Sequence, residues 1–272
     1  MASCFTTRFE GIDKTFRFIN LPEDSLIETD WEDINRSICA DEALMSWLSR
    51  LNGTDCRTFD TIYVMDPVRG IFQDDLSTYM TAFDDLTETY LNIYQRKGAR
   101  AGAGMIWQNR KTAPILGVQS DNVILIDYEK IMEVNQAIGV TAVICTVLHE
   151  CTHLIETYVA DGDCLLGRMT EELEASCSRE LFFDPQELFA RCPTLGPAVR
   201  HYVEYCASYQ QAEGQQREIL TSAVELLAAA ALDMKDIAGG EGLKNAEDLL
   251  GSHLERGLSM MQSQMLMNTD LV

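Results

Sequence analysis

The sequence predicts an α+β protein in which a small sheet forms early and helices make up most of the second half. Short β-rich runs bounded by turn residues occur only in the first half, for example at residues 62–65 and 122–127. From residue 141 onward, apolar side chains recur at helical intervals almost without a break. Strands that precede a run of helices are typical of α+β folds with segregated helices. The sheet is expected to be mixed or antiparallel.

No internal repeat or low-complexity linker divides the chain. The elements predicted for the first half are, in order, an apolar strand-like start, a helix at 40–53, a strand at 62–65, a helix at 73–97, a flexible basic loop at 96–104, and strands at 105–107 and 122–127. The helices predicted after them are at 128–138, 141–158, 170–183, 195–212, 214–237 and 241–262.

The chain is strongly acidic, with 43 aspartates and glutamates against 21 lysines and arginines and a formal net charge of -22 at pH 7. Such a charge repels the phosphates of nucleic acids and anionic membrane surfaces, and it attracts cationic partners. We therefore expect no direct nucleic-acid binding and no membrane binding. A basic protein or a basic cleavage site is the expected substrate. The acidic surface also suggests a mimic of nucleic acid that captures a DNA-binding protein.

The cysteines and the N-terminal residues bear on the compartment. Nine cysteines occur without a Cys-x-x-Cys pair, and the first residues lack the apolar core of a signal peptide. Both features favour reduced thiols in a soluble, cytoplasmic protein, or in one delivered into another cell without a cleaved signal peptide.

The most informative stretch reads HECTH, from His149 to His153, inside an apolar run that is predicted to form a buried helix. Residues i and i+4 lie on one face of a helix, so both imidazoles can reach a single tetrahedral metal ion. Glu150 points about a quarter-turn away, where it can accept a proton from water without ligating the metal. The pattern predicts one Zn²⁺ per chain, with His149 and His153 as ligands and Glu150 as the general base.

The alternative is a core helix whose two histidines are merely hydrogen-bonded and whose glutamate lies at the surface. Burial of a histidine, a glutamate and a second histidine costs desolvation energy unless these groups are paired. A metal ion provides that pairing, so the zinc interpretation is preferred.

A catalytic zinc needs a third protein ligand and an open position for water. The helix predicted at 170–183 begins with several glutamates, among them Glu171 and Glu174. Glutamates in the first turn of a helix favour its dipole, which explains Glu171 better than Glu174, about one turn further in. Both remain candidates for the third ligand on the residues alone.

An HExxH helix followed by a short loop and a second helix with a ligand glutamate resembles the glutamate-zincin peptidases. Over about residues 120–190 the chain is similar to the ImmA/IrrE-type peptidases, whose ligand glutamate stands in a run E-A-x-x-x-A-x-E-L-x-x-P. Glu174-Ala175 and Pro185 keep this spacing, whereas the Glu-Leu pair comes one residue early. The resemblance implies a zincin-like fold with Glu174 as third ligand. Zincin effectors and toxins with Thr-Glu at the second helix make Glu171 the alternate ligand.

The predicted activity is that of a zinc metalloendopeptidase acting on a specific protein or peptide substrate. Zinc would acidify a water molecule and polarise the scissile carbonyl, and Glu150 would pass the water's proton to the leaving amine. His201 and Tyr205, at i and i+4 on a predicted helix, are the candidate oxyanion stabilisers. An edge strand next to the active helix should pair with extended substrate, and residues 105–107 and 122–127 compete for that place.

The metal site suggests a division of one zincin-like domain, residues 1–272, into an N-terminal mixed part (1–120), a metal-site core (121–190) and a helical C-terminal part (191–272). The competing hypothesis is a non-catalytic helical binding protein in which the metal is structural or absent. A structural zinc would take a fourth protein ligand, for which His201 is the candidate.

Overall fold

The computed structural model describes most of the sheet, the HECTH helix and the helices packed around it. The described residues are 2–22, 25–52, 59–67, 96–112, 114–135, 138–161, 184–191, 193, 200–201, 203–205, 207, 218–229 and 231–232.

Five strands form one mixed sheet in the order β1-β2-β3-β5-β4. Its members are β1 (Ala2–Thr7), β2 (Thr15–Pro22), β3 (Thr61–Met65), β4 (Gly117–Ser120) and β5 (Val123–Ile126). The three central strands β2, β3 and β5 run parallel, and the outer strands β1 and β4 are antiparallel to their neighbours. The predicted α+β class with an early mixed sheet is therefore confirmed.

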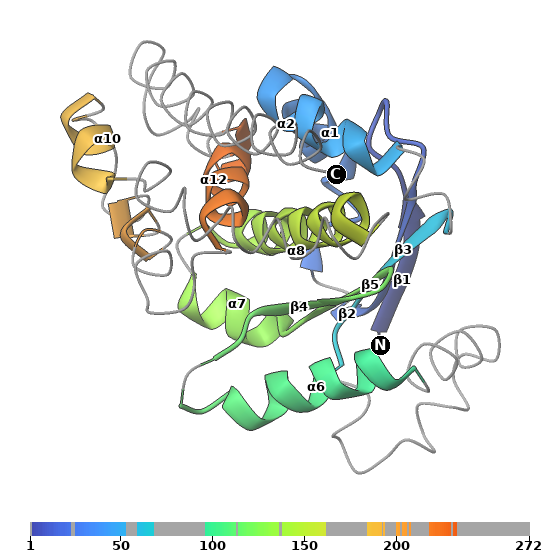
Figure 1. The fold of residues 1–272 in the computed structure, drawn as a ribbon. Coiled ribbons are helices and arrows are strands. Elements are labelled where there is room, and N and C mark those ends of the chain that lie inside the picture. Colours follow the sequence, from blue (N-terminus) through green and yellow to red (C-terminus); the bar gives the residue numbers. More distant parts are fainter. Residues whose placement is uncertain are drawn as a thin grey trace, which may run out of the picture.

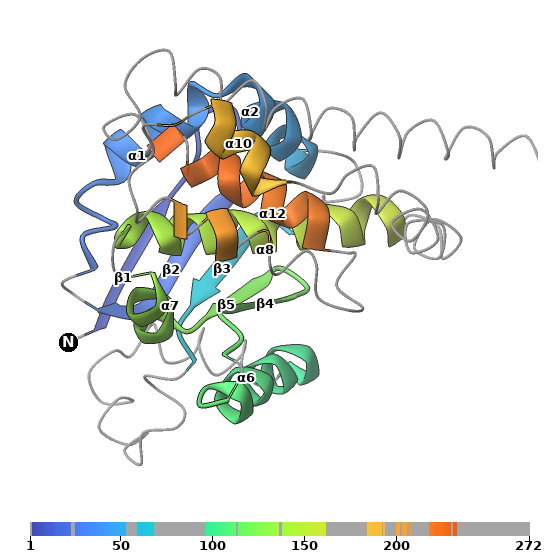
Figure 2. The same cartoon turned by 90° about the vertical axis from the view of Figure 1, so that its left-hand side faces the viewer.

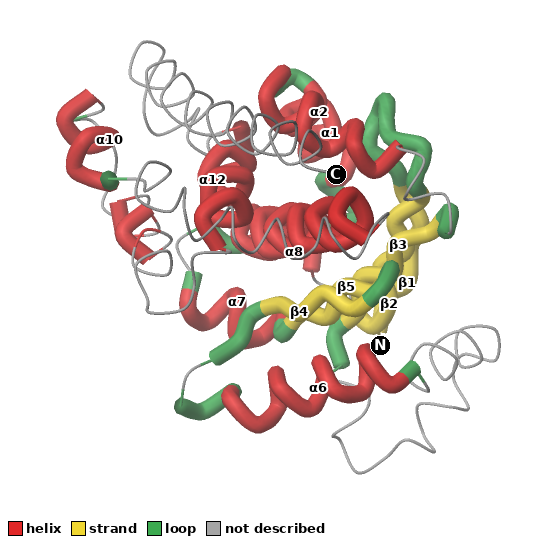
Figure 3. Tube along the Cα trace, viewed as in Figure 1, coloured by secondary structure: helices red, strands yellow, loops and turns green. Residues whose placement is uncertain are grey.

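Helices cover both faces of this sheet (Figures 1 and 2). Their bounds are α1 Trp31–Cys39, α2 Glu42–Leu48, a 3-10 turn Ser49–Asn52, α6 Lys97–Asn109, α7 Tyr128–Val134, α8 Val140–Asp161, α10 Pro185–Arg191 and α12 Glu218–Ala229. Of the described helices, α6 is the one that lies on one face of the sheet. On the other face α8 crosses the sheet, with α7 beside it and α1, α2 and α12 packed beyond, so helices and strands form separate layers (Figure 3).

The two faces of the sheet bury two separate apolar clusters. The larger cluster joins the α8 face of the sheet to α1, α2, α8 and α12, and it includes Phe16, Trp47 and Leu148. The smaller one packs the α6 face against Ala103 and Ile106. Because side chains alternate between the faces of a strand, β5 contributes to both clusters and is buried throughout. Helix α8 therefore lies in the larger core, as its apolar sequence predicts.

Helix α6 corrects two predictions. Residues 96–104 were expected to be a loop and residues 105–107 a strand, but all of them except the N-cap Arg96 belong to this helix. Its buried positions Ala99, Gly102, Ala103 and Ile106 follow a helical i, i+3, i+4, i+7 spacing. A Cβ at Gly102 would lie 2.9 Å from Val118 Cγ1, so the glycine permits close packing of the helix on the sheet. Glycine acts here as a packing residue and not as a helix breaker.

The edge strand is also different from the two that were proposed. Residues 105–107 are helical, and β5, which contains most of 122–127, is paired on both sides. Among the described strands, β4 forms the edge beside α8. A two-residue turn, in which Asp121 adopts a φ of 52°, reverses the chain between β4 and β5.

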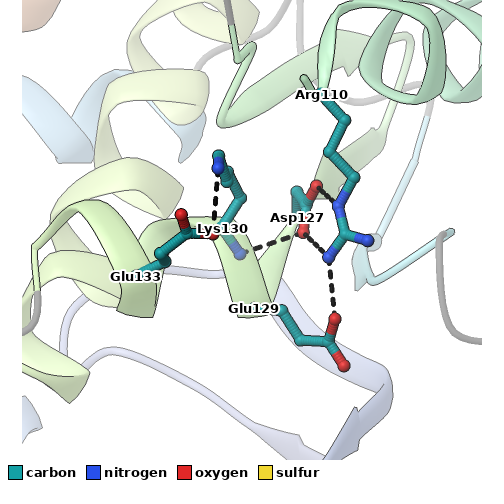
Figure 4. A network of polar contacts seen from close by, with 5 residues as sticks. All are labelled: Arg110, Asp127, Glu129, Lys130 and Glu133. Atoms are coloured by element: carbon teal, nitrogen blue, oxygen red, sulfur yellow. Dashed lines mark hydrogen bonds and ion pairs between the residues drawn. The ribbon is translucent and has the colours of Figure 1, made fainter.

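The connection into β4 is fixed by a polar network around Asp127 (Figure 4). Arg110, just after α6, donates to Asp127 Oδ2 at 2.7 Å and pairs with Glu129 Oε2 at 2.7 Å. Asp127 caps α7 by accepting from Lys130 N at 3.1 Å, and its own N–H donates to Leu116 O at 3.0 Å. The network therefore anchors both ends of the segment that leads into the edge strand.

The other predicted elements have mixed outcomes. The helices expected at 128–138 and 141–158 and the strands at 62–65 and 122–127 are confirmed within a few residues. The helix expected at 40–53 is present as α2 and the 3-10 turn. Helix α12 lies within the predicted 214–237. The helices expected at 73–97, 170–183 and 241–262 fall wholly or almost wholly outside the described residues. No helix of the described part is long and apolar enough to cross a membrane.

Candidate metal centre

Helix α8 places the two histidines of HECTH on one face. His149 and His153 are one turn apart, with ring centroids separated by 5.1 Å and ring planes inclined by 75°. The same helix is anchored away from the site by Thr152, whose hydroxyl accepts a hydrogen bond from Trp47 Nε1 at 3.1 Å. The imidazoles are thus oriented by a helix that the core holds in place.

Helix α12 brings a glutamate to both histidines. Glu218 Oε2 lies 3.0 Å from His149 Nε2 and 3.2 Å from His153 Nε2. The three potential ligand atoms all lie within 4.8 Å of one another. Two imidazoles and one carboxylate are the donor set of a catalytic zinc site with a remaining open position. The side chains present therefore fit a metal ion, and His149, His153 and Glu218 form a candidate metal site.

Two further residues of α12 orient these groups. Thr221 Oγ1 donates to the Glu218 carboxylate at 3.1 Å, or to the Glu218 carbonyl at 2.9 Å. Glu225 Oε2 lies 3.3 Å from His149 Nδ1. Positions 218, 221 and 225 are spaced i, i+3 and i+7, so one face of the helix carries all three. A carboxylate at Nδ1 fixes the tautomer that leaves Nε2 free to ligate a metal.

The site's electrostatics explain why these groups tolerate burial together. Burial acts to lower the pKa of His149, but hydrogen bonds to Glu218 and Glu225, together with the charges of Glu225 and Glu150, outweigh it and raise that pKa to about 10. Burial acts to raise the pKa of Glu218, but the two histidines lower it well below its usual value. The carboxylates of Glu218 and Glu225 therefore favour the protonated form of the His149 imidazole, and the two histidines favour the ionised form of Glu218.

Glu150, the predicted base, is buried beside the cluster and faces the edge strand. Desolvation raises its pKa, the charges of His149 and His153 act to lower it, and Glu218 and Glu225 act to raise it. It lines a cavity of about 430 Å³, including the solvent-open mouth. The cavity's other lining residues are Pro114, Ile115, Leu116, Gly117, Thr146, His149, Tyr205 and Glu225. A proton-accepting side chain, a candidate metal site and an open cavity thus occur together.

The other predicted site residues are placed differently. Glu174 and Glu171 lie outside the described residues, so their part as ligands stays a prediction. Tyr205 is half-buried and lines the cavity, whereas His201 is exposed and is not among the lining residues. The described cluster contains three ligands, and His201 is not one of them.

Glu218 and its partner Glu225 were not predicted from the sequence. The signal was the run EILTSAVELLAAAAL, which is apolar apart from a few polar residues and the two glutamates seven positions apart. Two acids on one face of an apolar helix need a buried cation or hydrogen-bond donors. That reasoning predicts a polar partner but does not say which one.

Zinc binding is expected to release about one proton near neutral pH, because His149 must give up its Nε2 proton to ligate the metal. With a pKa of about 10 for His149, the apparent zinc affinity should rise roughly tenfold per pH unit on the acidic side of that value. Calorimetric titrations in buffers of different ionisation enthalpy would measure the proton count. A zinc affinity that does not change between neutral and mildly alkaline pH would contradict the assigned ligand.

Comparison of the chain with protein-family models, with curated proteins and with solved structures found no match. The candidate metal site formed by His149, His153 and Glu218 is a feature of the described residues that agrees with the zincin resemblance.

Proposed function

We propose that the protein is a zinc-dependent metalloendopeptidase that hydrolyses peptide bonds of a specific protein substrate. The proposal rests chiefly on one observation: His149, His153 and Glu218 meet beside Glu150 at an open cavity. A catalytic zinc site uses three protein ligands and keeps one position open for water, and His149, His153 and Glu218 would supply these three ligands.

The chain's own residues suit the steps of peptide hydrolysis. Zinc, when bound by the triad, would acidify water and polarise the carbonyl of the scissile bond. Glu150 is assigned the role of general base, which accepts the water's proton and returns it to the leaving amine. Tyr205 is the better of the two candidate oxyanion donors because it lines the cavity. Glu225 holds His149 in the tautomer that a ligand needs.

The edge strand supports binding of an extended peptide. Leu116 O accepts from Asp127 N at 3.0 Å, so the backbone of Leu116 is directed toward β5. In an antiparallel pair the next residue turns its backbone groups the other way, so those of Gly117 face the free edge of β4. A substrate added as a strand to this edge would run along the cavity. Glu150 would then lie next to its backbone.

The negative charge of the chain favours basic substrates. With a net charge of -22, its field raises the local concentration of cationic peptides, an effect that salt weakens. We therefore expect faster cleavage of basic segments at low ionic strength.

The test is to purify the chain without a histidine tag, measure bound metals by mass spectrometry, and identify peptide bonds cleaved in a proteome-derived peptide mixture. We expect about one zinc per chain, with internal cleavages that stop on chelation and resume when zinc is added back. Absence of zinc after zinc is supplied, or cleavage insensitive to chelation, would refute the proposal.

A further inference from the structure

Gly117, the first residue of β4, makes room for the side chain of Glu150. A Cβ built on Gly117 would lie 2.5 Å from Glu150 Oε1, 2.9 Å from Cγ and 3.0 Å from Cδ. Real Cβ atoms almost never approach other heavy atoms closer than 3.0 Å. The carboxylate of Glu150 therefore occupies the volume that any other residue at position 117 would fill.

The backbone at position 117 does not itself require glycine. The glycines of the described part with left-handed φ values are Gly11 and Gly139, at 82° and 52°, and Gly117 is not among them. Strand residues with a Cβ can adopt the same region of φ and ψ. The requirement for glycine is thus one of space next to Glu150.

Packing, more than hydrogen bonding, fixes Glu150. No hydrogen bond to its carboxylate is found within the described ranges, although the charges of the two histidines act on it. A buried carboxylate that is fixed by van der Waals contacts shifts when one of the contacting groups is enlarged or displaced. On the side of the edge strand, the contacting group is the backbone of Gly117.

We propose that Gly117 is a positioning residue that holds the Glu150 carboxylate between the metal-binding triad and the edge strand. The inference rests on the proposed function, because the position matters for catalysis only if Glu150 is the base. A larger residue would push the carboxylate away from the reacting water while leaving His149, His153 and Glu218 in place. Positioning errors near 1 Å can lower rates about 100-fold.

The first experiment tests the contact without any activity. Denaturant unfolding midpoints would be measured without metal for wild type, Gly117→Ala, Glu150→Ala and the double variant. Gly117→Ala should lower the midpoint when Glu150 is present, and much less when Glu150→Ala has removed the three crowded atoms. If Gly117→Ala fails to fold, folding of the double variant supports the contact equally. Equal losses in both backgrounds, or failure of both variants to fold, would overturn it.

Gly102→Ala is the matched control for overpacking on the opposite face of the sheet. Its Cβ would lie 2.9 Å from Val118 Cγ1 and 3.0 Å from Leu125 Cδ1, and neither residue lines the cavity. It should lower the midpoint by the same amount in the wild-type and Glu150→Ala backgrounds, because Gly102 does not contact the Glu150 side chain.

The second experiment tests the catalytic consequence with the zinc-loaded protein. Gly117→Ala should retain its zinc, lose about 100-fold in kcat and change less in KM, while Gly102→Ala keeps a kcat near that of wild type. The unfolding midpoints could show that Gly117→Ala depends on Glu150 while kcat of Gly117→Ala equals that of wild type. That result would overturn the positioning role and leave the peptidase proposal intact. Absence of cleavage by wild type would refute the proposed function and the catalytic role of Gly117 with it, whereas the unfolding cycle would still decide the contact.

Discussion

Replacement of Glu150 by glutamine is expected to lower the rate of peptide hydrolysis by about 10²–10⁴-fold while zinc stays bound. Glutamine has nearly the same shape, so it should fit against Gly117 as glutamate does. It cannot accept a proton from water, and loss of a general base typically costs about 10²–10⁴-fold in rate. Measured kcat/KM should fall within that range, with zinc content equal to wild type. Because desolvation raises the pKa of Glu150, removal of its charge should leave the unfolding temperature unchanged or higher.

The control is the same chemical change at an exposed site. Glu133 on α7 pairs with Lys130 at the surface, at 2.9 Å, and its side chain is 69% exposed. Glu133→Gln should therefore retain activity, zinc content and stability. A Glu150→Gln variant with more than a tenth of wild-type kcat/KM would show that Glu150 is not the base. Loss of zinc in this variant would instead make Glu150 part of the metal site.

The strands and helices that were predicted correctly are those that the local sequence determines without tertiary contacts. Residues 62–65 and 122–127 are apolar runs closed by turn residues, and the HECTH helix is apolar over several turns. Helix α6 was missed because its glycines suit a helix only when a sheet lies against them, as Val118 does against Gly102. The edge strand was also not predicted correctly. Its identity depends on which strands pair with one another, and the sequence of a single strand does not determine its partners.

The candidate site also combines residues that the local sequence predicts with residues that only tertiary packing brings together. His149, Glu150 and His153 are related by helical periodicity, which is local and readable from the sequence. Glu218 comes from a separate helix far along the chain, and only the packing of α12 on α8 brings it to the histidines. The third ligand was expected in the next helical segment because that segment begins with several glutamates and the resemblance places a ligand glutamate there. Gly117 could not be found at all, since its role exists only through contact with Glu150.

Removal of Glu218 is expected to empty the metal site. Glu218→Ala deletes the carboxylate that lies 3.0 and 3.2 Å from the two ligand nitrogens. Loss of an outer partner of a zinc ligand costs about 10–100-fold in affinity, so loss of the ligand itself should cost more. Glu225→Gln, which weakens the contact with His149 Nδ1 but leaves all three proposed ligands in place, should fall within that smaller range. Competition with a chromogenic chelator would rank the zinc affinities of wild type, Glu225→Gln and Glu218→Ala.

Glu174→Ala and Glu171→Ala are the decisive comparisons, because both residues were predicted as ligands from the sequence. If Glu218 is the third ligand, both variants keep wild-type zinc affinity. If Glu174→Ala or Glu171→Ala empties the site while Glu218→Ala does not, the third ligand lies in the segment after α8 and the assignment to α12 is wrong.

A metal held by His149, His153 and Glu218 also links α8 to α12, so its binding must stabilise the fold. A ligand that binds only the folded state at a free concentration 100 times its Kd stabilises by about 2.7 kcal/mol. Zinc should therefore raise the unfolding temperature of wild type, and a chelator should reverse the rise. In Glu218→Ala the same zinc concentration should have almost no effect, because the ion can no longer bridge the two helices. A full zinc-dependent rise in that variant would mean that the metal is bound without α12.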